Sequence, residues 1–415
     1  MKQYNWKKTF SLLLAAVMML ALLAGCNPGN GENGDGTPWD GDAYNDTEND
    51  VTFMDAPNAG DEVGGIGLQT VIIEVEGAAP VLWEEFFYDL WTAAAMIMQF
   101  EAVEDWDAPF EFNPFDEPMT YNEFAIRQAT QAALDRRTIE ILYNEVGAQW
   151  EDNFDEMRAA QMEMQDWSDE EFVGFLWEHH RITESAFVHV NAAMGRRTAT
   201  LQALYGEEGE LTSDAAVSAY VEENGIVRAK HILFSTDEER DARDAATAGS
   251  RAAETHEYLQ TLSGDELHAR FVEMMEEHGE DPGMEMNPDG YVFGDGVMTP
   301  AFYEGTLALN VGEMSAPIPT EFGYHIILRL PIAPDDHIMG GPFGPGGPLR
   351  QSAALFDLDR QLEVIKGNLQ YTFTAYFAQI IPGVIIEAEM LQTQENAQMT
   401  DEAEMQTQES DQMTD

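Results

Sequence analysis

The sequence contains one cysteine, Cys26, and few basic residues: 20 Lys and Arg stand against 77 Asp and Glu, a formal charge of −57 over 415 residues. A single cysteine cannot form an intrachain disulfide, so packing must hold any folded part together. The negative field disfavours nucleic acid and anionic head groups as partners, and it favours cations and basic polypeptides. The length favours two or three domains over one compact core.

Long apolar runs are also scarce, and the one near the start is short. A basic beginning and about fourteen apolar residues ending at Leu23 predict a signal peptide over residues 1–25, because a membrane-spanning helix needs about 20. The run ends in "LAGC", which resembles the bacterial lipobox. That resemblance implies a lipidated Cys26, carrying acyl chains such as palmitate, and a protein anchored at the extracytoplasmic face of the bacterial cell membrane. The alternative is an ordinary cysteine that follows a signal.

The composition changes along the chain in a way that predicts several parts. Residues 26–65 are rich in Gly, Asn and Asp, which predicts a disordered acidic tether. Residues 66–225 begin with the strand-like "LQTVIIEVEG" and continue with helical periodicity, which predicts a mostly helical, chaperone-like domain. Capping boxes start two of its helices, at Thr120 with Glu123 and at Ser168 with Glu171. Its stripes of Met and aromatic residues indicate core, or alternatively a groove for client polypeptides.

Residues 226–333 mix strand and helix patterns, which predicts a small α+β domain inserted in the mostly α-helical one. Residues 334–382 read as a Gly- and Pro-rich loop and a helix, from residue 349 to about 381, that packs on the helical domain. Residues 383–415 carry a nearly repeated acidic segment without a core-forming pattern, so we expect this tail to be disordered.

Two histidines stand in the apolar strands of the α+β part. His325 lies in "YHIIL" and His231 in "KHILF". A lone histidine in such a strand is usually a satisfied core residue. Two in equivalent places can meet if the strands pair, with one neutral ring donating a hydrogen bond and the other accepting it.

The segments "VRAKHILF", "GEDPG" and "FGDGVMTPAFYEGTLALNVGEMSAPIPTEFGYHIILRL" resemble the parvulin family of peptidyl-prolyl cis/trans isomerases. The order of lipobox, helical part and α+β part is similar to the PrsA-type extracytoplasmic foldase lipoproteins. The resemblance implies a βαααβαββ domain with an antiparallel sheet. It also implies site residues: His231 and His325 as the paired histidines, Thr320 in their hydrogen-bond network, Asp281 facing the substrate, and Met298 and Phe302 as the proline pocket.

Two stretches depart from the family pattern. Where the family usually has Gly-Asp-Leu-Gly, this chain has "NPDGYVF", so Gly290 or Tyr291 replaces a pocket leucine and the third wall of the pocket is left open. After "KHILF", phosphate-directed members carry basic residues, whereas "STDEERDARDAA" is mostly acidic. Selection for phosphorylated Ser/Thr-Pro is therefore not expected.

The chemistry implied by the resemblance needs no metal or cofactor. Rotation about an X-Pro bond crosses a barrier of about 18–20 kcal/mol and breaks no covalent bond. A site that fits the twisted amide better than either planar form is sufficient. Neither histidine is assigned as a nucleophile, because a hydrogen-bonded pair on a sheet is equally consistent with a structural role.

Two other motifs do not predict a metal site or a phosphate-binding loop. His179 and His180 lack a third ligand at metal-site spacing, which favours a pair at a helix end. "GGPFGPGG" lacks the Lys-Ser/Thr of a phosphate loop.

The sequence therefore predicts a membrane-anchored extracytoplasmic isomerase that acts on unfolded secreted polypeptides containing X-Pro, does not bind nucleic acid, and can form a homodimer. The alternatives are a holdase chaperone with an inactive parvulin domain and a solute-binding lipoprotein. The second is disfavoured because the alternating βαβ units of two α/β lobes are absent from the pattern.

Overall fold

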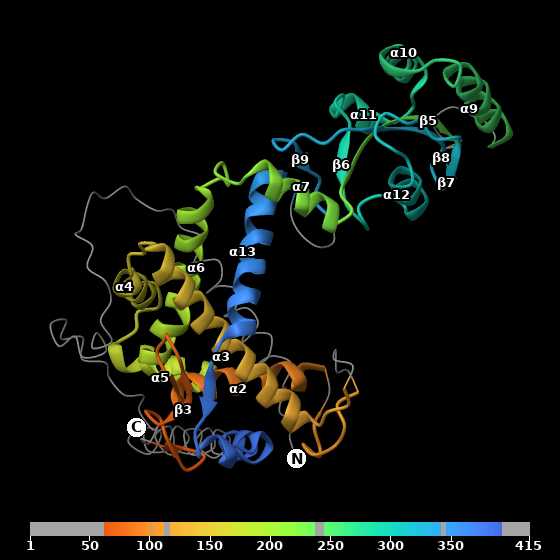
Figure 1. Ribbon diagram of the computed structural model, residues 1–415. Coiled ribbons are helices and arrows are strands. Elements are labelled where there is room, and N and C mark those ends of the chain that lie inside the picture. Colours follow the sequence, from red (N-terminus) through yellow and green to blue (C-terminus); the bar gives the residue numbers. More distant parts are fainter. Residues whose placement is uncertain (1–61, 101, 112–116, 237–244, 342–345, 392–415) are drawn as a thin grey trace, which may run out of the picture. The chain divides into compact units, whose positions relative to one another are not determined.

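The computed structural model describes residues 62–391 except 101, 112–116, 237–244 and 342–345. The predicted signal peptide, Cys26 and the tail beyond residue 391 lie outside the described residues, as does nearly all of the predicted tether. The chain divides into two compact units (Figure 1): unit 1 comprises residues 1–200 and 362–415, and unit 2 comprises residues 201–361. Unit 2 is thus inserted in the sequence of unit 1. Within the described residues, no helix combines the length and apolar character that crossing a membrane requires.

Unit 1 is mainly helical and carries small antiparallel sheets. Its elements are β1 (Glu62–Val63), β2 (Ile66–Gly67), β3 (Val71–Val75), β4 (Val81–Leu82), α2 (Trp83–Phe100), α3 (Tyr121–Val146), α4 (Phe154–Gln165), α5 (Asp169–His180), most of α6 (Glu184–Tyr205), β11 (Tyr371–Phe373) and the 3₁₀ turn η2 (Phe377–Gln379). One sheet has the strand order β11-β3-β4, which joins segments almost 300 residues apart in the sequence.

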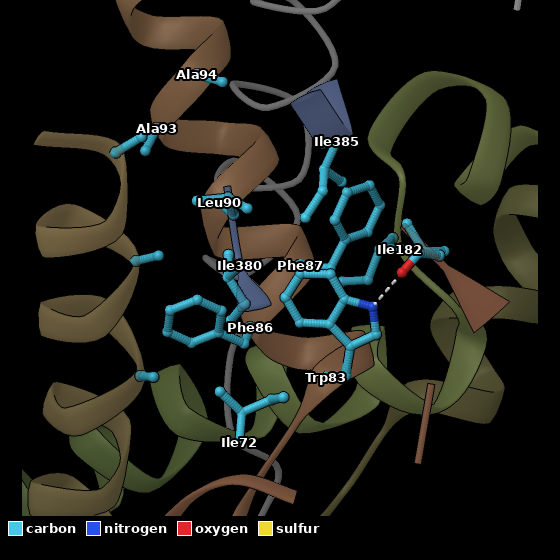
Figure 2. Close-up of a cluster of buried hydrophobic side chains, with 14 of the residues drawn as sticks. Ile72, Trp83, Phe86, Phe87, Leu90, Ala93, Ala94, Ile182, Ile380 and Ile385 are labelled. Carbon is cyan, nitrogen blue, oxygen red and sulfur yellow. Dashed lines mark hydrogen bonds between the residues drawn. The ribbon is translucent and has the colours of Figure 1, made fainter. Parts of the chain in front are cut away.

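The core of unit 1 is built on α2 (Figure 2). Trp83, Phe86, Phe87 and Leu90 follow the i, i+3, i+4, i+7 spacing of one helix face, and all four are fully buried. The indole N–H of Trp83 donates to the carbonyl oxygen of Val63 at 3.0 Å, which ties the first strand to this core. Most of the aromatic stripe predicted from the sequence is therefore core.

Both predicted capping boxes are confirmed. At the start of α3, the backbone N–H of Glu123 donates to the hydroxyl of Thr120 at 3.2 Å, and the Thr120 N–H donates to the Glu123 carboxylate at 2.8 Å. Ser168 and Glu171 make the same reciprocal pair at the start of α5.

Three predicted boundaries are wrong. The helix expected to run to about residue 381 is α13 (Leu349–Asn368), which ends before the β-prone "YTF" of β11 pairs with β3. Residues 382–391 are helical, although disorder was predicted from residue 383, because Ile385 and Ile386 are buried in the core. The tether was predicted to reach residue 65, but Val63 is already buried in β1.

Unit 2 contains the predicted βαααβαββ order. The elements are β5 (Val227–Ser235), α9 (Ala245–Leu259), α10 (Gly264–His278), α11 (Pro282–Met286), β6 (Tyr291–Phe293), α12 (Pro300–Leu307), β7 (Ile318–Thr320) and β8 (Gly323–Leu330). The sheet order is β6-β5-β8-β7 and every pairing is antiparallel. The predicted fold class, a parvulin-like α+β domain inserted in a mostly helical part, is confirmed. Unit 2 also contains α7 (Asp214–Glu223), β9 (His337–Ile338), β10 (Gly347–Pro348) and the larger part of α13.

Helices cover both faces of this sheet (Figure 1). On one face, α9 brings the guanidinium of Arg251 over the ring of Phe234. On the other, α12 places Phe302 against both histidines. Alternate residues of β5 and β8 therefore face opposite sides of the sheet, and the histidine face is the one covered by α12.

A buried ion network joins α2 to α3. Arg137 donates to Glu85 at 2.6 and 3.1 Å and to the carbonyl oxygens of Ala79 and Pro80, while Arg136 donates to Glu85 and Asp89. Burial raises the pKa of Glu85, but the two guanidiniums outweigh it and hold that pKa at about 2. Removing one partner of such a network leaves a charge buried without compensation.

We therefore expect Arg137→Met to destabilise unit 1 by about 3–5 kcal/mol. The matched control is Lys366→Met, which breaks the partly exposed pair with Asp135 and should cost about 0–1 kcal/mol. All eight tryptophans lie within residues 1–200, so tryptophan fluorescence in a urea titration reports on unit 1 alone. Equal losses in the two variants would contradict a structural role for the network.

Candidate active site

The two histidines lie in the centre of the unit 2 sheet and face the same side. Leu233 stands opposite His325 in the β5–β8 pairing, and His231 is two residues before Leu233, so both rings point to one face. Their Nδ1 atoms are 2.9 Å apart and the ring centroids 5.0 Å apart. His231 is 4% exposed and His325 5%. The structure thus brings the predicted pair into direct contact.

Asp281 closes one end of the pair. It is the N-cap of α11, where the backbone N–H of Gly283 donates to Oδ1 at 3.0 Å. Its Oδ2 lies 2.8 Å from Nε2 of His231 and accepts the hydroxyl of Tyr291, also at 2.8 Å. Burial raises the pKa of this carboxyl, but the hydrogen bond and charge of His231, with Tyr291 and Gly283, lower it to about 2. Asp281 is therefore ionised at neutral pH.

Thr320 closes the other end. It is the last residue of β7, and its Oγ1 lies 2.7 Å from Nε2 of His325. The backbone N–H of Phe322 donates to the same oxygen at 3.2 Å. The four side chains form one continuous path in the order Asp281, His231, His325, Thr320.

The ionised carboxylate sets the direction of the first bond in this path, and the proton count of His231 sets the other two. Asp281 can only accept, so Nε2 of His231 carries a proton and donates to it. If His231 is neutral, its Nδ1 must accept from Nδ1–H of His325, and Nε2 of His325 then accepts the hydroxyl proton of Thr320. A second proton on His231 would reverse the central bond and the bond to Thr320, so that Thr320 becomes the acceptor, while the bond to Asp281 keeps its direction. The proton count of His231 therefore decides whether Thr320, on the far side of the pair, donates or accepts.

His325 is held neutral by its surroundings. Burial lowers its pKa, the neighbouring His231 lowers it further, and Asp281 opposes this only in part, so that the pKa is about 3. Only Asp281 and Thr320 are partly open to solvent, whereas both imidazoles are buried. The geometry fits substrate contact at the two ends and a positioning role for the histidines between them.

The apolar residues predicted for the pocket lie beside this path. Phe302, on α12, packs edge-on against both rings, with centroid distances of 5.0 Å to His231 and 5.3 Å to His325. It is 4% exposed, so it supports the histidines from beneath more than it lines an open wall. Met298 precedes α12, is half-buried, and packs against the same core.

Gly290 and Tyr291 stand where a leucine would form the third wall of the proline pocket. Gly290 has φ +95°, and a Cβ there would stand 2.7 Å from the carbonyl oxygen of Ala229, so no leucine fits. Tyr291 is 7% exposed and turns its hydroxyl to Asp281. The sequence marks this position as unusual, since Gly290 or Tyr291 stands where the family has a pocket leucine, but it does not predict the contact with Asp281.

The remaining candidates are not among the side chains that form this site. Two cavities in unit 2, of about 340 and 500 Å³, are lined by other residues and contain none of the predicted site side chains. His179 and His180 end α5, and burial lowers the pKa of His180 to about 4. Across the described part of the chain, no group of three or more His, Cys, Asp or Glu side chains is arranged to hold a metal ion.

The comparisons with known proteins centre on the same segment. Residues 231–330 match the family model described as Rotamase: PPIC-type PPIASE domain. The chain is 29% identical over 146 residues to Foldase protein PrsA of Caldanaerobacter subterraneus subsp. tengcongensis, covering 34% of this chain and 42% of that protein. It is 33% identical over 126 residues to Foldase protein PrsA of Halalkalibacterium halodurans, covering 29% and 32%. The chain thus spans less than half the length of these curated relatives.

Among solved structures, the PrsA peptidylprolyl isomerase of Bacillus cereus is similar over 64% of this chain and 86% of that one, with 14% identity and a TM-score of 0.23. These low values do not extend the family assignment beyond residues 231–330.

The neutral, buried His325 predicts a pH dependence of stability. Its folded-state pKa is below the value of about 6.5 in an unfolded chain, so its contribution is complete above pH 6.5 and is lost as the pH falls toward 3. In wild type, this one group should lower the stability of unit 2 by about 1.4 kcal/mol per pH unit between pH 6 and 5. In His325→Gln that contribution should be absent. The window lies above the range in which Asp281 titrates.

The measurement is hydrogen exchange of the β5 and β8 amides in the full chain at pH 5, 5.5 and 6, because unit 2 contains no tryptophan. His268→Gln, at an exposed position on α10, is the matched control and should keep the wild-type slope. Identical slopes in all three proteins would show that His325 is not held neutral by burial.

Proposed function

We propose that this chain, whose residues 231–330 are a PPIC-type rotamase domain of the parvulin family, is a peptidyl-prolyl cis/trans isomerase that assists the folding of other polypeptides. The observation that carries the proposal is the unbroken path from Asp281 through His231 and His325 to Thr320, with Phe302 packed against both rings. It supports the reaction because the polar ends and the apolar support are the groups that a twisting X-Pro amide requires.

The path can act without a covalent step. As the amide rotates, conjugation is lost, the nitrogen becomes pyramidal, and the carbonyl loses its zwitterionic character. The fixed negative charge of Asp281 and the oriented dipole of Thr320 act on these atoms, and their preorganisation by the histidine pair avoids reorganisation during the rotation. Met298 supplies apolar contact for the proline ring.

The whole protein, in this proposal, is lipid-anchored outside the cell membrane and acts on unfolded or partly folded secreted polypeptides. The lipobox at Cys26 supports the anchor, and the relatives named Foldase protein PrsA support the class of substrate. The charge of −57 would attract basic unfolded chains. Homodimer formation stays a prediction.

Met298→Ala should lower kcat/KM for X-Pro peptides by about 10-fold or more, because truncating an apolar pocket contact costs about 1–3 kcal/mol of transition-state binding. The measurement is a protease-coupled or NMR-exchange assay on the full chain, with acidic, basic and apolar residues before proline. Met286→Ala is the matched control, since Met286 is 77% exposed at the end of α11 and should leave the rate unchanged.

The same assay distinguishes the holdase alternative. A folded wild-type chain that suppresses aggregation of an unfolded protein but accelerates no peptide in the panel would replace the isomerase proposal with the holdase. Equal rates in the two methionine variants would remove Met298 from the pocket.

Cys26→Ala should release the protein from the membrane, because that cysteine is the only one available for lipidation. After expression in a bacterial host with labelled palmitate, wild type should carry label and sediment with membranes, whereas the variant should carry none. Retention of the variant at the membrane as a shortened, processed chain would contradict the proposed lipid anchor.

A further inference from the structure

Tyr291 places a hydroxyl on Asp281 at the point where the histidine path begins. It opens β6 and pairs with Ala229 on β5, two residues before His231. Its hydroxyl donates to Oδ2 of Asp281 at 2.8 Å, the same oxygen that accepts from His231. Its ring centroid lies 6.0 Å from that of His231.

The surrounding backbone leaves room for this hydroxyl because Gly283 has no side chain. A Cβ built on Gly283 would stand 1.9 Å from the Tyr291 hydroxyl oxygen, far inside contact distance. Gly290, just before the tyrosine, has φ +95°, a conformation that other residues rarely adopt. Tyr291, Gly283 and Gly290 thus form one fitted arrangement around the carboxylate.

The electrostatics of the contact favour a permanent donor. Burial raises the pKa of Tyr291, and the hydrogen bond to Asp281 and the charge of that carboxylate raise it further, so the phenol stays protonated. A protonated phenol stabilises the ionised form of Asp281 and adds no positive charge to the site.

We propose that Tyr291 is a positioning residue: its hydroxyl holds Asp281 ionised and in one rotamer, and thereby fixes the order of protons along His231, His325 and Thr320. This inference rests on the proposed function only for its effect on rate, because the proton order can be measured without any activity. The carboxylate that Tyr291 fixes is the one partly exposed charge of the path, with 21% of its side chain accessible.

The variant that tests this is Tyr291→Phe, which keeps the ring and removes the hydroxyl. Tyr303→Phe is the matched control, because Tyr303 is half-buried in unit 2 and its hydroxyl donates to a backbone carbonyl, that of Gly225, at 3.0 Å. Thermal unfolding and hydrogen exchange of β5 and β8 establish that both variants are folded.

The activity arm is a double-mutant cycle with Asp281→Asn in the full chain. Tyr291→Phe should lower kcat/KM by about tenfold in wild type and by less than about twofold in the Asp281→Asn background, because the hydroxyl acts through the carboxylate. It should also move the acidic limb of the kcat/KM pH profile upward by at least about half a pH unit. Tyr303→Phe should do neither. Equal losses in both backgrounds would overturn the proposal, since a merely structural tyrosine would act independently of Asp281.

The activity-independent arm uses the full chain with ¹⁵N-labelled histidine and long-range ¹H–¹⁵N spectra of the imidazole nitrogens. Wild type at pH 7 should show His231 protonated at Nε2 and His325 protonated at Nδ1, and Tyr291→Phe should change the protonated nitrogen or mix the two arrangements. If wild type lacks isomerase activity, this arm still decides the role of Tyr291. An unchanged spectrum in Tyr291→Phe would overturn that role even if the enzyme is active.

Discussion

The contact between the Nδ1 atoms of His231 and His325 is the interaction on which unit 2 depends. Two buried imidazoles 2.9 Å apart cannot both be charged, and neither can lack a partner; when both are neutral, each acts as donor on one side and acceptor on the other. The outer nitrogens of the pair therefore bind Asp281 and Thr320, which are partly open to solvent. The contact also fixes the sheet, because β5 and β8 pair over eight residues and a slip of one residue would turn one histidine to the opposite face.

Each element around the pair fulfils one condition of that contact. The helix α12 packs the edge of Phe302 against both rings, which prevents the rings from turning. The first turn of α11 holds Asp281 through the N–H of Gly283, and β7 presents Thr320 at the opposite end. The reaction proposed here breaks no bond, so a rigid, correctly polarised surface is more useful to it than a mobile nucleophile.

The sequence predicted most of this arrangement because local patterns and the family resemblance agreed. The βαααβαββ order, the capping boxes at Thr120 and Ser168, and the meeting of the histidines all follow from short, recognisable signals. The errors came from a strand pairing between distant segments and from the burial of Val63, Ile385 and Ile386 in the core of unit 1. The segment containing β11 reads as a continuation of α13 until β3, almost 300 residues earlier, supplies a strand edge.

Within the site, the contact of Tyr291 with Asp281 was unpredictable for a related reason. No sequence pattern reports that Gly283, two residues after Asp281, leaves space for a phenol that comes from another element. The burial of Phe302 was likewise missed, since a resemblance to pocket residues names the side chain and does not give its exposure.

The scarcity of basic residues gives the site a particular electrostatic character. In unit 1 several guanidiniums form ion pairs with buried carboxylates: Arg136 and Arg137 with Glu85, and Arg158 with Glu184. In the site, by contrast, the donors to Asp281 are the backbone N–H of Gly283, the phenol of Tyr291 and an imidazole of the histidine pair. An arginine partner would lower the pKa of Asp281 equally well, but it would cancel the negative charge that a substrate amide experiences. Neutral donors, such as the backbone N–H of Gly283 and the phenol of Tyr291, keep the carboxylate ionised without cancelling its charge. Asp281 can therefore both hold the proton on Nε2 of His231 and act electrostatically on the rotating amide bond.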